Sequence, residues 1–144
     1  MPIVGFNFDK ILAEKKEPVT RNLKIKPEVT IEAVKIEEFA ISSGKKEKLL
    51  KVIFDFSIGY LPKIGLIQIK GHILYSGNPK ELEEISMNWK KNKDKKNDIF
   101  LNFINSILVR CNIKALSLSQ EVNLPPQLRM PTLTKKVDPK DYIG

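Results

Sequence analysis

Apolar residues recur at spacings of three and four along residues 98–118, the most extended apolar pattern in the chain. Polar residues such as Asn102, Asn105 and Arg110 fall mainly on the other side. Because an α-helix turns once every 3.6 residues, this spacing predicts one long helix with an apolar face. Such a helix would be about 30 Å long and would need a large apolar partner surface. The recurring residues are Phe100, Phe103, Ile104, Ile107, Leu108, Cys111, Ala115 and Leu118.

Earlier in the chain, apolar and polar residues alternate, which is typical of strands with one buried face. The clearest alternation covers residues 50–60, and Leu61-Pro62-Lys63 after it predicts a hairpin turn. Residues 29–41 are also strand-like, but their apolar phase slips twice, which indicates a bulge or a strongly bent strand. The apolar positions of the clear strand and of its return strand are Leu50, Val52, Phe54, Phe56, Ile58, Tyr60, Ile67, Ile69, Ile73 and Tyr75.

The first 27 residues are ambiguous. Val4, Phe6 and Phe8 alternate as in a short strand, whereas Phe8, Ile11 and Leu12 fit one helical turn. Prolines interrupt the region further along. We therefore expect residues 1–27 to be an N-terminal arm laid across a neighbouring element or subunit.

A short helix is predicted to start at Pro79, since Asn78 suits the cap position and Pro79 the first helical position. Glu81 completes a spacing like that of a capping box. Leu82, Ile85 and Trp89 supply the apolar side of this helix, which should fray over residues 90–97.

Prolines 125, 126 and 131 exclude a helix after the long one and favour an extended segment. Its apolar residues are numerous enough for the segment to be packed, whereas residues 135–144 are polar and are expected to form a flexible tail. These patterns predict one α+β domain over residues 28–134. Its curved antiparallel sheet of about four strands would be packed by one long and one short helix.

At 144 residues with 42% apolar residues, the chain is the size of one ordinary domain with a sizeable core. Its single cysteine, Cys111, cannot form an internal disulfide and falls on the apolar side of the long helix, so we expect an inert packed thiol. We find no signal-peptide pattern and no stretch that approaches the ~20 apolar residues of a membrane span. We therefore expect a soluble cytoplasmic protein.

The net charge of +8 suggests attraction to anionic surfaces. Half of it comes from residues 90–96, where five lysines face one aspartate. This run is either a phosphate-contacting loop or a solvated linker, and the linker is favoured because no aromatic residues interleave to stack on bases. Elsewhere Lys and Glu are interspersed, and the usage of Lys, Glu and Ile resembles that of hyperthermophile proteins. The lysines are Lys90, Lys91, Lys93, Lys95 and Lys96.

No catalytic signature is present in the sequence. His72 is the only histidine, and it has no second His and no Cys beside it to complete a metal site. We therefore interpret it as a strand histidine with a hydrogen-bond partner. Glu81, Glu83 and Glu84 suit the first turn of a helix as well as acid–base chemistry. Phosphate-binding glycine loops and zinc-protease motifs are lacking. We expect no enzymatic activity, no metal and no cofactor.

The order of elements, together with three short stretches, resembles the SecB family of protein-export chaperones. The stretches are Ile99-Phe100-Leu101 and Ile107-Leu108-Val109 in the long helix and residues 126–131 after it, which read Pro-Gln-Leu-Arg-Met-Pro. The resemblance covers roughly residues 29–133. It implies a homo-oligomer that holds unfolded chains in apolar grooves between sheet and helix. SecB is acidic and this chain is basic, so its charge-based docking to an export motor is not carried over.

Three functions follow as hypotheses. The first is a SecB-like protein that binds unfolded or partner polypeptides, with Phe54, Phe56, Phe100 and Phe103 lining the groove, although each of these is also explained as core. The second is a basic RNA- or ribosome-associated module that uses the lysines of residues 90–96. The third is an oligomeric structural protein whose extended tail pairs subunits.

Overall fold

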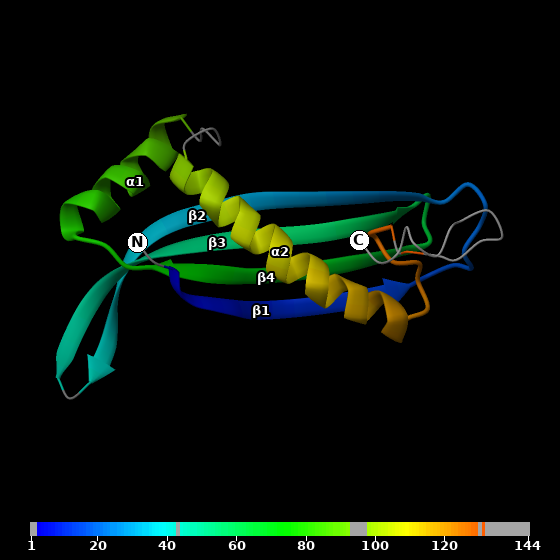
Figure 1. Cartoon of the computed structure of the whole chain (residues 1–144), viewed down its shortest axis with the longest axis horizontal. Helices are drawn as coiled ribbons and strands as arrows, with labels where there is room; N and C mark the ends of the chain where they lie inside the picture. The colour runs from blue at the N-terminus through cyan, green and yellow to red at the C-terminus, as the bar shows by residue number, and fades with distance from the viewer. Residues whose placement is uncertain (1–2, 43, 93–97, 130, 132–144) are drawn as a thin grey trace, which may run out of the picture.

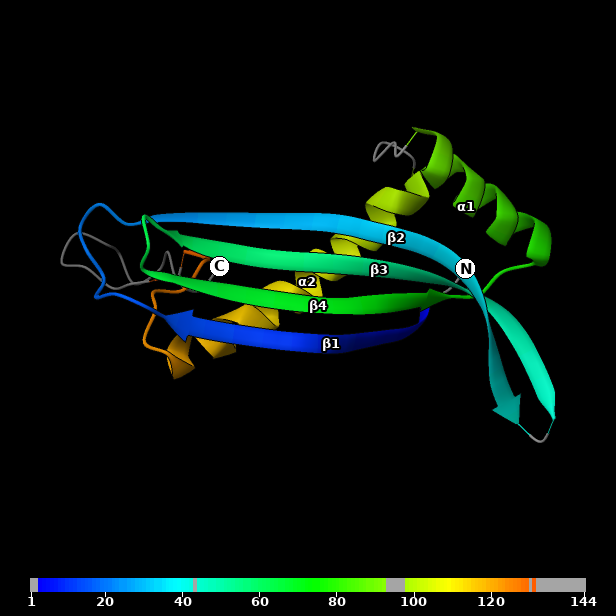
Figure 2. The same cartoon turned by 180° about the vertical axis from the view of Figure 1, so that it is seen from behind.

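Four strands form one antiparallel sheet, and two helices follow them in the chain (Figure 1). The computed structural model describes residues 3–42, 44–92, 98–129 and 131. The strand order is β1-β4-β3-β2, and the sheet is curved (Figure 2). This arrangement confirms the predicted α+β fold. The elements are β1 (Ile3–Lys15), β2 (Lys24–Ser42), β3 (Lys45–Leu61), β4 (Gly65–Tyr75), α1 (Pro79–Asn92) and α2 (Asp98–Glu121).

The core lies between one face of the sheet and α2. Every second residue of β3 from Leu50 to Tyr60 is fully buried, as the alternation predicted. On α2 the buried positions include Phe103, Ile107 and Cys111, which follow the predicted helical spacing. The helix crosses the sheet diagonally, from the β2 edge to the β1 edge (Figure 1). Since α2 covers only one face, the other face of the sheet carries half-buried and polar residues.

The C-terminal end of α2 is closed by a left-handed residue. Asn123 has a φ of 56°, and the amide of Leu124 donates to the carbonyl of Ser119 at 2.8 Å. The amide of Asn123 also donates to the carbonyl of Gln120 at 3.4 Å. This pair of bonds is the Schellman arrangement, in which asparagine is the usual alternative to glycine at the left-handed position. It turns the chain back toward the sheet, where Leu124 is buried.

The segment after α2 packs against its own chain. The Tyr60 hydroxyl donates to the carbonyl of Pro125 at 2.7 Å, and Gln127 Nε2 donates to the carbonyl of Asn112 on α2 at 2.8 Å. Leu128 at the end of this segment is 45% exposed. The predicted packing is thus confirmed for Leu124 and through the contacts of Pro125 and Gln127, whereas Leu128 and Arg129 are exposed. Met130, Leu133 and the expected tail at 135–144 lie outside the described residues.

The N-terminal region is part of the sheet, and the expectation of a separate arm over residues 1–27 was wrong. Residues 3–15 form β1, which pairs with β4 along its whole length. β2 then begins at Lys24, after a connection that crosses from one edge of the sheet to the other. The alternation of Phe6 and Phe8 was the correct signal. The apparent helical turn at Ile11 arises because a register shift between Phe8 and Lys10 changes the phase of the strand.

The two phase slips predicted for residues 29–41 have different causes. The first is a bulge in β2, where the pairing with β3 shifts between Ile31 and Ala33. At the second, between Ile36 and Phe39, the pairing with β3 stays regular, and the next shift lies between Ala40 and Ser42. Because β4 ends opposite Leu50, the ends of β2 and β3 project as a ribbon beyond the sheet (Figures 1 and 2). In this ribbon, the alternation of apolar and polar residues no longer indicates which face of the sheet is buried.

The short helix starts as predicted. The side-chain oxygen of Asn78 accepts a bond from the amide of Glu81 at 2.8 Å, and Pro79 is the first helical residue. The Glu81 carboxylate also accepts a bond from the Tyr75 hydroxyl at 2.9 Å, which ties α1 to the end of β4. The expected fraying over residues 90–97 falls largely outside the described residues, since α1 is described to Asn92.

Among the described residues, α2 alone is long and apolar enough to cross a membrane by length and composition. The expectation that no stretch approaches a membrane span was therefore wrong by this criterion. One such helix is weak evidence for a span, because the core helix of a soluble protein meets the same criterion. In this fold one side of α2 is buried against the sheet and the other side carries exposed apolar residues.

Candidate polypeptide-binding site

The four phenylalanines predicted to line a groove belong to the core. Phe54 and Phe56 have no exposed surface, and Phe100 and Phe103 are each 1% exposed. They lie between the sheet and α2, and Phe103 packs edge-on against Tyr75 with ring centroids 5.5 Å apart. A polypeptide cannot reach these side chains while α2 covers the sheet. The structure therefore supports the core interpretation of all four residues, and any binding surface must be sought elsewhere.

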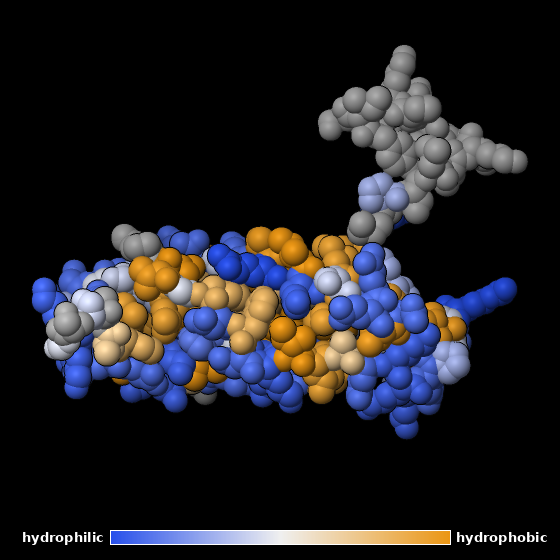
Figure 3. Space-filling model, turned by 90° about the horizontal axis from the view of Figure 1, so that it is seen from below, coloured by the Kyte–Doolittle hydropathy of each residue, from blue (hydrophilic) through white to orange (hydrophobic). Residues whose placement is uncertain are grey.

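Exposed apolar side chains gather instead on β1. Phe8 is 36% and Ile11 43% exposed, and Phe6 is half-buried. All three pair with residues of β4 whose positions face α2, so they lie on the helix side of the sheet. They stay uncovered because α2 runs diagonally and leaves part of the β1 edge open. Figure 3 views the molecule from this edge and shows apolar side chains in patches along it.

The outward side of α2 also carries exposed apolar side chains. Arg110 places its guanidinium 4.9 Å from the centroid of the Phe6 ring, a cation–π contact that joins the helix to β1. Val109 is 61% and Ile113 66% exposed on the same side of the helix. Between Asp98 and Glu121 only Arg110 and Lys114 are charged. We call Phe6, Phe8, Ile11, Val109, Arg110 and Ile113 the α2–β1 surface.

The backbone of β1 adds a second kind of binding group to this surface. β1 lies at the edge of the sheet, and among the described residues no strand pairs with its outer side. An edge strand presents unpaired N–H and C=O groups that can pair with another extended chain. Register shifts between Ile3 and Gly5 and between Phe8 and Lys10 divide this edge into short regular stretches. Such shifts limit unspecific pairing without removing the free groups.

Gly71 is the reason why β1 can lie so close to the core. A β-carbon at this position would overlap the carbonyl oxygen of Asn7 on β1 and would lie 2.8 Å from Phe54 Cζ. The absence of a side chain lets the Phe54 ring extend under β1, where it packs on Phe6 with centroids 5.2 Å apart. The position of the α2–β1 surface thus depends on a glycine of the neighbouring strand.

His72 has the structural role that the sequence predicted. Its Nδ1 lies 2.7 Å from Asp9 Oδ2, and Nδ2 of Asn7 lies 3.3 Å from its Nε2. These bonds connect β4 to the bulge of β1 on the sheet face opposite α2. Nearby, Lys70 lies between Glu32 at 3.6 Å and Asp55 at 3.8 Å. The centre of this face is therefore occupied by paired polar groups, which suits a solvated surface.

Burial also raises the pKa of three titratable groups in the core. It raises the pKa of the Cys111 thiol to about 12, and this side chain has no exposed surface. The thiol is therefore protonated at neutral pH, which confirms the predicted inert cysteine. Burial, with the hydrogen bond to Glu81 and its negative charge, raises the pKa of Tyr75 to about 12. Burial also raises the pKa of Tyr60.

The structure brings together few of the other candidate groups. Lys93, Lys95 and Lys96 lie outside the described residues, and Lys90 and Lys91 are exposed in the last turn of α1. Among the carboxylates predicted for acid–base chemistry, Glu81 is bound to Tyr75, while Glu83 and Glu84 are exposed. Within the described ranges no group of three or more His, Cys, Asp or Glu side chains is placed to hold a metal ion.

Sequence reasoning missed the α2–β1 surface because it assigned one apolar face to the long helix. Val109 and Ile113 fall outside the buried stripe, and they lie in a part of the chain that is almost free of charge. Those two facts together would have indicated a second apolar side. The exposure of Phe8 could not be inferred, since it depends on the angle at which α2 crosses the sheet.

Comparison with solved structures identifies the fold. The chain is similar to the SecB-like chaperone Rv1957 of Mycobacterium tuberculosis, solved in complex with a ChAD peptide from the HigA1 antitoxin Rv1956. The similarity covers 94% of this chain and 92% of that chain, with a TM-score of 0.50 and 12% identity. The fold is SecB-like. The sequence matches no protein-family model and no curated protein.

Proposed function

We propose that this chain is a non-enzymatic, SecB-like polypeptide-binding protein that holds unfolded or partner polypeptides on the α2–β1 surface. The observation that carries the proposal is the apolar edge of β1, with which no other described strand pairs and where Phe8 and Ile11 are exposed. The SecB-like fold and the peptide present in the structure of Rv1957 add support.

The geometry favours an extended ligand. A segment in β conformation can pair its backbone with β1 and place alternate side chains toward α2, where Phe8 and Ile11 offer apolar contact. Backbone pairing requires no particular ligand sequence, and burial of each large apolar side chain contributes about 1.5–3 kcal/mol. Several such contacts in succession yield a sequence-tolerant site, which a protein that holds unfolded chains requires.

The test is suppression of client aggregation. A chemically unfolded client is diluted into buffer with the wild-type protein or with the double variant Phe8→Ser/Val109→Ser, and light scattering is recorded. We expect the wild type to reduce aggregation and the double variant to lose most of this effect. Met87→Ser is the control for loss of one exposed apolar side chain, because Met87 is 55% exposed on α1, which lies away from β1 (Figure 1). If the wild type has no effect, or if the control loses as much as the double variant, the proposal fails.

A second copy of the chain is the competing occupant of this surface. The exposed side of α2 carries Val109 and Ile113 and few charges, and such a side can pack against a second copy. Size measurements by light scattering, with and without client, separate the two cases. If the protein associates through Val109 and Ile113 and the client does not compete, the client binds elsewhere. The RNA-binding alternative stays a prediction.

A further inference from the structure

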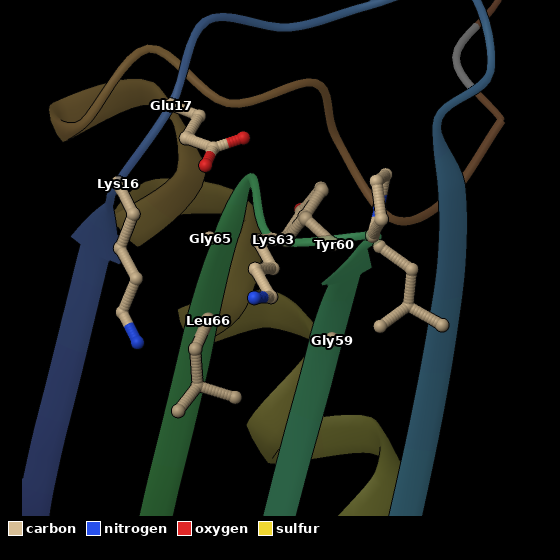
Figure 4. A pocket seen from close by; sticks show the side chains of 9 residues that line it. Lys16, Glu17, Gly59, Tyr60, Lys63, Gly65 and Leu66 are labelled. Atoms are coloured by element: carbon tan, nitrogen blue, oxygen red, sulfur yellow. The ribbon is translucent and has the colours of Figure 1, made fainter.

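A hollow lies at the far end of the sheet, on the face opposite α2. It is formed where the β3–β4 turn meets the start of the connection from β1 to β2, and its volume is about 540 Å³. The side chains of Lys16, Lys63 and Leu66 lie on the near side of the strands in Figure 4, with α2 behind them. Two smaller hollows share Leu61 with it. We call these three neighbouring hollows, which share Leu61, the end hollow.

The lining of the end hollow mixes polar groups with a few apolar side chains. Leu61 is 41% exposed, and Leu66 is half-buried beside it. Gly59 deepens the floor, because a β-carbon there would meet only Leu61 Cδ2 and the Lys26 carbonyl, each at 3.9 Å. The space above Gly59 is therefore open and large enough to receive a side chain from a ligand.

The rim of the end hollow is basic. Lys16, Lys24, Lys26 and Lys63 lie here with the carboxylates Glu17 and Glu28, and Glu14 pairs with Lys16, so the local net charge is +1. Lys16 pairs with Glu14 at 3.2 Å and Lys26 with Glu28 at 3.6 Å, and both pairs are exposed and therefore weak. Among the described residues no ion pair forms at Lys24 or Lys63. Within the part of the chain that the structure describes, these two ammonium groups thus stand beside Leu61 and Leu66 without an ion-pair partner.

The backbone holds this site in a fixed shape. The carbonyl of Ile64 accepts bonds from the amides of Lys16 at 2.7 Å and Glu17 at 3.2 Å, which join the crossing connection to the β3–β4 turn. Behind the sheet, the bond from Tyr60 to Pro125 fixes the end of β3. A preformed site of this kind loses little conformational entropy when a ligand binds.

We infer that the end hollow binds acidic segments of polypeptides, with an apolar side chain over Gly59 and neighbouring carboxylates at Lys24 and Lys63. The inference rests on the proposed function, since the ligand is a polypeptide, but it assigns a separate site on the other face of the sheet. Nucleic acid fits less well. The one aromatic lining residue, Tyr60, has its ring buried on the helix side, so no aromatic ring is available for base stacking.

Fluorescence anisotropy with short labelled peptides tests this inference. Three peptides share the same leucines, separated by glutamates, serines or lysines. We expect the acidic peptide to bind most tightly and the basic one least. The double variant Lys24→Ser/Lys63→Ser should weaken acidic-peptide binding about tenfold at low salt. The control Lys46→Ser/Lys80→Ser removes the same charge from distant exposed sites and should change binding less than about twofold.

Gly59→Leu provides a second test. The leucine side chain would fill the hollow and would weaken the binding of the acidic peptide and of the serine peptide to the same extent. If this variant does not fold, the lysine variants still decide the outcome. Equal binding of the acidic and basic peptides, or equal losses in both double variants, overturns the inference. The inference is also overturned if single-stranded RNA binds through Lys24 and Lys63 and the acidic peptide does not bind.

The two proposals fail separately. Phe8→Ser/Val109→Ser should keep acidic-peptide binding, and Lys24→Ser/Lys63→Ser should keep aggregation suppression for a client without acidic segments. If only the first variant has an effect, the end hollow is not a peptide site and the proposed function stands. If the wild type binds the acidic peptide but suppresses no aggregation, the proposed function fails and the end hollow remains a peptide site.

Discussion

Replacement of Gly71 by alanine should destabilise the sheet at β1, the strand that carries Phe6 and Phe8. The added methyl group would overlap the Asn7 carbonyl oxygen and would lie 2.8 Å from Phe54 Cζ. Neither neighbour can yield easily, because one is backbone and the other is a ring with no exposed surface. Overpacking of this kind costs about 1–3 kcal/mol. We expect a value near the upper end, since β1 must move.

Gly59→Ala is the matched control in the adjacent strand of the same sheet. Its β-carbon would have no neighbour closer than 3.9 Å. Alanine is also favoured over glycine inside a strand by about 0.5–1 kcal/mol. The control should therefore leave the free energy of unfolding unchanged or raise it slightly. The two variants should differ by about 2–4 kcal/mol, although the chemical change is the same.

Urea unfolding followed by circular dichroism measures this difference, and amide hydrogen exchange locates it. In Gly71→Ala we expect the amides of residues 3–15 to lose protection first, because the clash separates β1 from β4. The variant should also lose aggregation suppression, since the edge that carries Phe8 and Ile11 is displaced. Equal unfolding midpoints for Gly71→Ala and Gly59→Ala would refute the argument that β1 needs a glycine at position 71.

Three further predictions concern the helix and the core. Ile107→Ala should lower the free energy of unfolding by about 2–5 kcal/mol, and Ile113→Ala, on the exposed side of α2, by less than about 0.5 kcal/mol; equal losses in urea unfolding would contradict the burial pattern. Asn123 has a left-handed backbone conformation, so Asn123→Ala should lower the free energy of unfolding by about 1 kcal/mol, whereas Asn123→Gly should leave it unchanged. Thermal unfolding of the two variants measures this difference. The free energy of unfolding should fall as pH rises from about 9 toward 12, because folding raises the pKa of Cys111 and Tyr75 so that the native state holds protons that the unfolded chain loses. Cys111→Ala should make the free energy of unfolding fall less steeply with pH. An unchanged slope in this variant would contradict the role assigned to the buried thiol.

Most of the fold could be predicted because its local signals are strong. The alternation from Leu50 to Tyr60 corresponds to buried positions, and so does the spacing from Phe100 to Leu118, except that Ile104 and Leu108 are partly buried. Asn78 and Pro79 marked the start of α1 correctly. The N-terminal segment was misjudged because the bulge after Phe8 changes the strand phase, so that a strand imitates a helical turn. The pairing partner of an edge strand cannot be read from local sequence.

The candidate sites could not be predicted to the same extent. Phe54 and Phe100 looked suitable for a groove, yet residues that are apolar and regularly spaced are those that α2 covers. The exposed residues, such as Phe8 and Ile113, are set by the diagonal crossing of α2, which no short pattern encodes. The end hollow combines Lys16, which follows β1, with Gly59 and Lys63 of the β3–β4 hairpin. Only the folded sheet brings them together.

Hydrogen exchange with and without a bound unfolded client tests the central claim most directly. A client that remains unfolded in buffer is added in excess, and exchange is followed along the whole chain. The account predicts slower exchange in β1, residues 3–15, because the client pairs with its free edge, with little change in β3. Unchanged exchange in β1, together with protection confined to other elements, would contradict the claim that this edge holds polypeptides.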